Sequence, residues 1–138
     1  MNRSDIAPCG IDCINCELHQ SSTRTDIQQM VAASMNKTVE EIKCKGCLDQ
    51  NGCVIHEDCK TLECVKTKGV DYCYECSDFP CNYLMPAQDM ADRLPHNMKV
   101  YNLCRIKQLG PEKFLQEALE NRKRYFAGKM VIGSGPQI

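Results

Sequence analysis

Cysteine is the residue type whose number and spacing point to chemistry in this sequence. The chain has 138 residues, of which 12 are cysteines, and their short spacings are typical of thiolate ligands to zinc. Three cysteines lie between Cys9 and Cys16, eight lie between Cys44 and Cys81, and Cys104 stands apart. We therefore expect the chemistry of this protein to reside in the segment that ends at Cys81.

The choice between metal ligation and disulfide bonds depends on the cellular compartment. The N-terminal segment has no apolar run like the core of a signal peptide, and no later stretch is long enough to span a bilayer. We therefore expect a cytoplasmic protein without a membrane partner. In the cytoplasm thiols stay reduced, so closely spaced cysteines favour metal ligation, whereas structural disulfides are the alternative for an exported protein.

The first group of cysteines places three thiols, those of Cys9, Cys13 and Cys16, within eight residues. A turn can point all three at one ion, because Gly10 gives the backbone room to bend. A tetrahedral zinc site needs a fourth ligand. His19 has the spacing of a ligand partner to Cys16, but a polar surface role is an equal alternative, and a cysteine of the second group is the stronger candidate.

The second group contains two C-x-x-C pairs, Cys44 with Cys47 and Cys73 with Cys76. In such pairs, backbone amides near a tight turn stabilise thiolate charge on zinc. A ribbon-like site would combine the two pairs. An interleaved arrangement would instead combine one pair with Cys59 and Cys64, and the sequence leaves both pairings open.

The sequence predicts cysteine ligands for two or three zinc ions. The expected ligands are Cys9, Cys13, Cys16, Cys44, Cys47, Cys53, Cys59, Cys64, Cys73, Cys76 and Cys81. An iron-sulfur cluster is the alternative cofactor, since four thiolates also suit a cluster, although the ferredoxin run C-x2-C-x2-C-x3-C-P is absent. His56 could replace a thiol, but an exposed histidine is the commoner case. We expect Cys104 to be a buried core residue.

The cysteine-rich part of the chain can bury little apolar surface by itself. Without cysteine, apolar residues make up only about a third of the chain, and Trp is absent. Ordering one residue costs ~1–2 kcal/mol, whereas a structural zinc site contributes ~10 kcal/mol or more. We therefore expect metal binding and folding to be coupled.

Helical patterns connect the cysteines to the rest of the chain. The sequence predicts a short helix over 25–35, a turn begun by a capping box at Thr38 and Glu41, and a helix over 58–68 that ends at Gly69. From residue 87 onward the pattern is helical, first up to Gly110 and then from Pro111 to residue 128. On the last helix, a buried stripe is expected at Phe114, Leu115, Ala118, Leu119, Tyr125 and Phe126.

These patterns predict a small, mainly α-helical fold stabilised by metal, in which irregular cysteine-rich loops with short helices precede C-terminal helices. We expect a single compact domain over 1–130, with a cysteine-rich metal-binding part at 1–85 and a helical part at 86–130. Residues 131–138 are rich in glycine and read as a flexible tail.

Several of these motifs occur together in one known family. The motifs are Pro8-Cys9-Gly-Ile-Asp-Cys13-x-x-Cys16, Cys44-Lys-Gly-Cys47, Cys59-x4-Cys64 and Cys73-x-x-Cys76-x-x-Phe79-Pro-Cys81. Together they resemble the bacterial and archaeal family called domain of unknown function 3795, and the segment 102–110 resembles its C-terminal helix. The resemblance implies a metal-binding protein, usually described as a zinc binder, with no assigned activity. Cys53 and Cys104 lie outside the pattern that it requires.

Charge and the remaining motifs restrict the function. The net charge of -1 gives no electrostatic reason to expect nucleic acid as a partner, and we interpret Arg122 to Arg124 as a complement to a helix C-terminus. No catalytic residue is predicted, because the three histidines are scattered and no nucleophile motif is present, so an enzyme is the less favoured class.

Closed four-thiolate zinc sites are chemically inert and supply folding energy. We therefore expect a structural zinc-binding module that contacts an unknown macromolecular partner. A redox role for an iron-sulfur cluster or for the C-x-x-C thiols is one alternative. Metal storage or delivery through exchangeable zinc is the other.

Overall fold

The computed structural model describes residues 2–56 and 58–138. Within these residues it has five α-helices, which are α1 (Thr25–Ser34), α2 (Val39–Ile42), α3 (Lys60–Lys68), α4 (Lys99–Leu109) and α5 (Pro111–Ala127). Short 3-10 helices connect them at Arg3–Asp5, Cys13–Asn15, Cys73–Glu75, Asn82–Leu84 and His96–Met98. The strands β1 (Lys129–Val131) and β2 (Gly135–Gln137) form an antiparallel pair. The expected small, mainly α-helical fold is confirmed.

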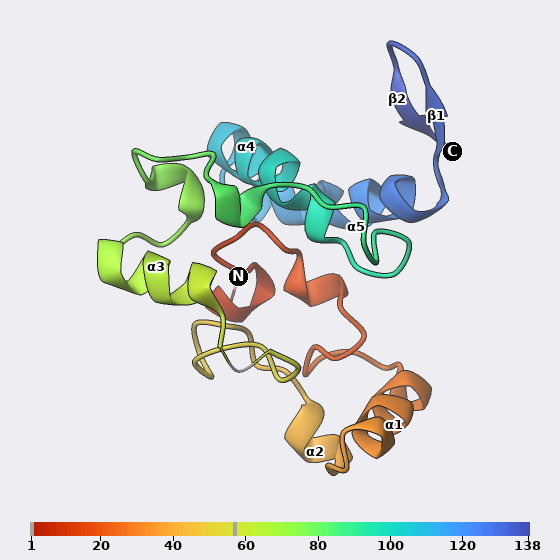
Figure 1. Cartoon of the computed structure of the whole chain (residues 1–138). Coiled ribbons are helices and arrows are strands. Elements are labelled where there is room, and N and C mark those ends of the chain that lie inside the picture. The colour runs from red at the N-terminus through yellow and green to blue at the C-terminus, as the bar shows by residue number, and fades with distance from the viewer. Residues whose placement is uncertain (1, 57) are drawn as a thin grey trace.

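The helices lie on two sides of the N-terminal segment. In Figure 1, α4 and α5 run side by side on one flank, α1 and α2 occupy the opposite end, and the N-terminal segment lies between them. The two strands extend from the end of α5. No helix of the described part of the chain is long and apolar enough to cross a membrane.

Three helix boundaries agree with the prediction from sequence. At the start of α2, the Thr38 N–H donates to Glu41 Oε2 at 2.7 Å, and the Glu41 N–H donates to Thr38 Oγ1 at 3.3 Å. α3 ends at Gly69, which has a φ of 65°, a left-handed conformation that glycine adopts without steric cost. α5 begins at Pro111.

The helical pattern over 87–95 is not realised as a helix. This segment consists of bends and turns in the described structure. Met90 has a φ of 57°, which interrupts a right-handed helix, and Pro95 disfavours helical backbone at the residue before it.

The exposed and buried faces of the C-terminal helices differ from the prediction. Cys104 is exposed, so its prediction as a core residue is wrong. The buried face of α4 consists instead of Asn102, Leu103 and Ile106, each at most 1% exposed, and the next residue after Leu103 is rotated by about 100° away from that face. On α5, Phe114 and Ala118 are buried, but Leu119 and Phe126 of the predicted stripe are exposed. The predicted stripe was therefore too wide.

The apolar core is divided into three small groups. The first contains Ile6, Ile106, Phe114 and Ala118, the second contains Leu18, Ala32, Ile42 and Cys44, and the third contains Val65, Cys73, Leu84 and Leu103. Each group has only four buried members. Buried apolar area is the main source of stability in a small domain. Because each apolar group is small, we expect crosslinks through the cysteines to add to the stability of the fold.

The C-terminal strands have no signal in the sequence. Residues 131–138, for which a flexible tail was expected, contain β2 and the last residue of β1. Gly133 and Gly135 have φ values of 82° and 71°, which let the chain reverse direction in a tight turn. The side chains of Met130 and Ile132 are exposed, so these strands show no alternation of buried and exposed residues.

Candidate metal centres

Helix α4 holds the loop from Cys9 to Cys16. The Asn102 Nδ2 donates to the carbonyl oxygen of Gly10 at 2.7 Å, and both groups are buried. Gly10 has a φ of 87°, and a Cβ at this position would be 2.7 Å from the carbonyl oxygen of Lys99. Only glycine fits this close contact with α4, which explains why a glycine follows Cys9.

Helix α5 holds the same loop through a buried ion pair. Arg122 Nη1 lies 3.0 Å from Asp12 Oδ1, with side-chain exposures of 12% and 0%, and Asn15 Nδ2 donates to the second carboxylate oxygen at 3.0 Å. Arg122, which we interpreted as a complement to a helix C-terminus, instead binds a carboxylate of this distant loop. The pair joins residues 110 positions apart, so no local pattern in the sequence could reveal it.

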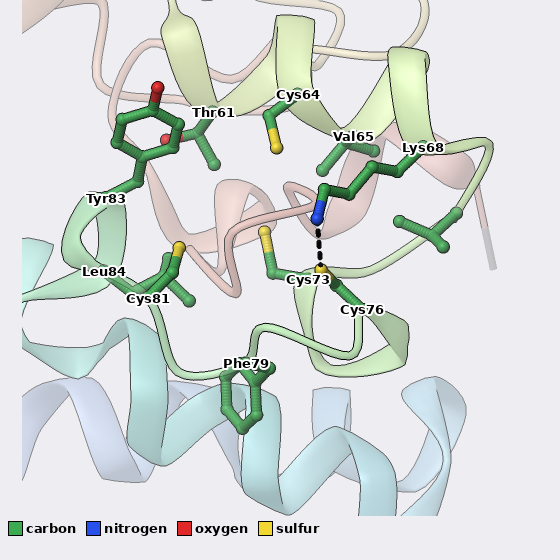
Figure 2. A pocket seen from close by; sticks show the side chains of 11 residues that line it. Thr61, Cys64, Val65, Lys68, Cys73, Cys76, Phe79, Cys81, Tyr83 and Leu84 are labelled. Carbon is green, nitrogen blue, oxygen red and sulfur yellow. Dashed lines mark hydrogen bonds between the residues drawn. The ribbon is translucent and has the colours of Figure 1, made fainter.

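Four predicted ligands line one small pocket, which Figure 2 shows from close by. Cys64 comes from α3, Cys73 and Cys76 come from the turn that follows it, and Cys81 lies beyond. The sulfur atoms of Cys64, Cys73 and Cys81 point toward the space between α3 and this turn. The pocket has a volume of about 20 Å³, which is enough for about one water molecule. We call these four residues the pocket cysteines.

The surroundings of the pocket cysteines are apolar on most sides and positive on one. Val65, Val70, Phe79 and Leu84 line the pocket. Lys68 Nζ donates to Cys76 Sγ at 3.1 Å and pairs with Asp78, and the Asp78 N–H donates to the same sulfur at 3.3 Å. Both donors therefore place positive charge next to this sulfur.

A second set of thiols lies between the first cysteine loop and the segment that follows α2. Burial raises the pKa of the Cys13 thiol, and the next causes are negative charge on Cys47 and on Cys9. Burial, followed by the charges on Cys9, Cys44 and Cys59, raises the pKa of Cys47 to about 12. We call Cys9, Cys13, Cys47 and Cys59 the central cysteines, because Cys47 interacts electrostatically with each of the other three.

The electrostatics of the central cysteines have a chemical consequence. Several thiolates so close together and shielded from water would repel each other strongly. A divalent cation reverses this effect, because it stabilises the thiolates that it binds. The arrangement therefore favours either protonated thiols or thiolates around a cation.

The remaining predicted ligands lie around Cys44. The Cys53 thiol donates to Cys44 Sγ, which lowers the pKa of Cys44 to about 6, and the Gly46 N–H donates to the same sulfur at 3.4 Å. Cys16 packs against the apolar group that contains Cys44. His19 is paired with Cys44 through the backbone and is only 2% exposed, so a surface role for this histidine is excluded. His56 is exposed, as expected.

The two C-x-x-C pairs lie in different parts of the structure. Cys73 and Cys76 lie with Cys64 and Cys81, which differs from the ribbon-like pairing with Cys44. No three Cys, His, Asp or Glu side chains among residues 2–56 and 58–138 converge closely enough to hold an ion as they stand. Metal binding would therefore require the side chains of a set to turn toward a common centre.

Gly46 lies in the first C-x-x-C turn and packs closely against Ser4. It has a φ of 90°, and a Cβ would be 2.5 Å from the Cα of Ser4. We expect Gly46→Ala to lower the free energy of unfolding at least twice as much as Gly69→Ala, which has a φ of 65° and no atom within 4 Å and should cost about 1 kcal/mol. Urea denaturation of both variants measures the difference, and equal losses would contradict the close packing at Gly46.

The comparison with known families extends over the cysteine-rich part of the chain. The model of a family described as "Protein of unknown function (DUF3795)" matches residues 5–86. The matched segment contains every cysteine except Cys104. No curated protein and no solved structure matches the chain. The match therefore covers the three sets of thiols but excludes α4, α5 and the strands.

Proposed function

The chain belongs to the family described as Protein of unknown function (DUF3795), and because this description assigns no activity, we propose a function from the geometry of the thiols. The protein binds zinc through the pocket cysteines and through the central cysteines. The ions serve to hold the fold, which presents a surface to a macromolecular partner. The single observation that carries this proposal is the pocket lined by four cysteines.

The pocket has the ligand type and the size that a structural zinc ion requires. Zinc is bound tetrahedrally by four thiolates in structural sites, whereas catalytic sites have three protein ligands and keep one position open. The pocket offers four thiols around a volume of about 20 Å³, which suits a single ion. The iron-sulfur alternative is less favoured, because the ferredoxin run C-x2-C-x2-C-x3-C-P is absent from the sequence.

The charges around the pocket support the same assignment. Zinc with four thiolates carries a net charge of -2, which is costly next to apolar walls. Lys68 Nζ and the Asp78 N–H both donate to Cys76 Sγ and offset part of that charge. Such contacts to ligand atoms are typical of the outer shell of metal sites.

A single ligand substitution tests the pocket. We expect Cys64→Ala to lower the zinc content by one ion per chain after dialysis against a competing chelator, because three thiolates hold zinc less tightly than four. Inductively coupled plasma mass spectrometry of the dialysed protein measures the content. The chelator is needed because a three-ligand site can still retain zinc with water in the fourth position.

Cys104→Ala is the matched control. Cys104 is an exposed cysteine on α4 and belongs to none of the three sets, so its substitution should leave the zinc content unchanged. Zinc content that stays at the wild-type value in Cys64→Ala, or that falls equally in both variants, would refute the assignment of the pocket cysteines.

A further inference from the structure

His19 has an unusual combination of burial and missing contacts. The residue is 2% exposed, and its Nε2 atom has no hydrogen-bond partner in the described structure. The nearest charged group is Asp5, whose Oδ1 lies 4.0 Å away, which is beyond hydrogen-bond distance. Buried polar atoms are nearly always hydrogen-bonded, so this nitrogen requires an explanation.

The other ring nitrogen of His19 is held in the manner of a metal ligand. Nδ1 lies 2.7 Å from Ser21 Oγ. The Ser21 backbone N–H donates to Nδ1 at 3.3 Å in the tautomer that carries its proton on Nε2, and metal binding at Nε2 requires the other tautomer. When Nδ1 carries the proton and donates to the hydroxyl, Nε2 presents a lone pair, which is the state in which histidine binds metal.

Backbone hydrogen bonds connect His19 and its neighbours to two of the three remaining cysteines, Cys16 and Cys44. Cys44 N–H donates to the Leu18 carbonyl at 2.7 Å, and the Gln20 N–H donates to the Cys44 carbonyl at 2.9 Å, so the backbones on both sides of His19 are fastened to Cys44. The His19 N–H donates to the carbonyl of Cys16 at 3.0 Å. Cys53 donates its thiol hydrogen to Cys44 Sγ.

We propose that His19 and Cys16, Cys44 and Cys53 form a third zinc site of three thiolates and one imidazole. The inference rests on the proposed function, since it assumes that the protein binds zinc at the other two sets. It assigns Nε2 of His19 as the ligand atom and Ser21 Oγ as the acceptor that orients the ring. Zinc binding then displaces the protons that the thiols of Cys16, Cys44 and Cys53 carry in the metal-free chain.

The third site accounts for every thiol in the matched segment. The pocket cysteines and the central cysteines use eight of the eleven thiols between Cys9 and Cys81, which leaves three without a fourth ligand. A buried histidine with a free nitrogen lies beside those three. It also explains why Cys53, which falls outside the family pattern, is close to Cys44.

Substitution of His19 tests the site through the number of ions bound. Native mass spectrometry of the full chain, loaded with Zn²⁺ and then dialysed against a competing chelator, should count three ions in the wild type, two in His19→Ala and three in His19→Cys, because a thiolate can replace the imidazole. His56→Ala is the matched control, since this exposed histidine lies three residues from Cys53 and should leave three ions. Asp5→Asn should also leave three.

Any other number of bound zinc ions overturns the proposed third site. Three ions in His19→Ala, or a loss of one ion in His56→Ala or Asp5→Asn, would show that His19 is not the ligand assigned here. Two ions in the wild type would refute the third site while the proposed function stands. A wild-type chain without zinc would refute both.

A measurement on the wild-type chain covers the case in which His19→Ala does not fold. After loading with ¹¹³Cd²⁺, we expect three cadmium resonances, of which one couples to the ring protons of a single histidine. The absence of any coupling between cadmium and a histidine ring would overturn the proposal. Assignment of the coupled ring to His19 by its loss in His19→Cys completes the test.

Discussion

Removal of metal by a strong zinc chelator should abolish the cooperative thermal unfolding of this chain. The apolar core is divided into three groups of four residues, whereas each structural zinc site contributes ~10 kcal/mol or more. A typical domain has a net stability of only about 5–15 kcal/mol. Removal of all the ions therefore removes more free energy than the whole fold retains.

Circular dichroism during heating measures this effect. The stripped protein should lose its sigmoidal transition and much of its helical signal, because a helix of the length of α5, 17 residues, is marginal in water without packing partners. Addition of Zn²⁺ should restore both signals. A stripped chain that keeps the melting transition of the untreated protein would refute the coupling between metal and folding.

Arg122→Met should be the most destabilising substitution outside the thiol sets. It leaves the Asp12 carboxylate, which is 0% exposed, without its cation, and breaking a buried pair in this way costs about 3–5 kcal/mol. In a domain of this size the loss corresponds to a fall in melting temperature of roughly 10–20 °C. The affected loop carries the first three cysteines, so the loss acts on the part of the fold that the metal stabilises.

A double-mutant cycle separates the buried charge from general damage to α5. The variant Asp12→Asn with Arg122→Met should recover part of the lost stability, because no unpaired charge remains. Arg124→Met is the control on the same helix. Arg124 pairs with Glu120 at the surface, with side-chain exposures of 50% and 51%, so its substitution should leave the melting temperature within error. A loss in Arg122→Met no larger than that of Arg124→Met would contradict the role of the pair.

The local elements of the fold could be predicted from the sequence because their signals are local. The capping box of Thr38, the terminating Gly69 and the initiating Pro111 each act through bonds or dihedral angles within one turn. The prediction of a helix at 87–95 is wrong because the apolar spacing of this segment suggests a helix, whereas Pro95 and the left-handed backbone of Met90 oppose one. The strands after α5 were not predicted because their side chains do not alternate between buried and exposed positions.

The grouping of the thiols could not be predicted, because it depends on contacts between distant segments. The sequence indicates which cysteines are close along the chain, but the loop from Cys9 to Cys16 is positioned by Asn102 and Arg122 from helices near the other end. The spacing from Cys16 to His19 did indicate a ligand pair. The burial of His19 excludes the alternative of a polar residue at the surface, and its role as a ligand is our proposal.

Native mass spectrometry of the full chain, purified without oxygen and without added metal, tests the central claim most directly. The mass separates zinc from iron and sulfide, and it counts the ions in each molecule. We expect the folded protein to carry two or three zinc ions and no iron, with no absorption in the visible range. A folded chain that carries no metal, or one that is brown and contains iron and sulfide, would contradict the claim that zinc thiolates hold this fold.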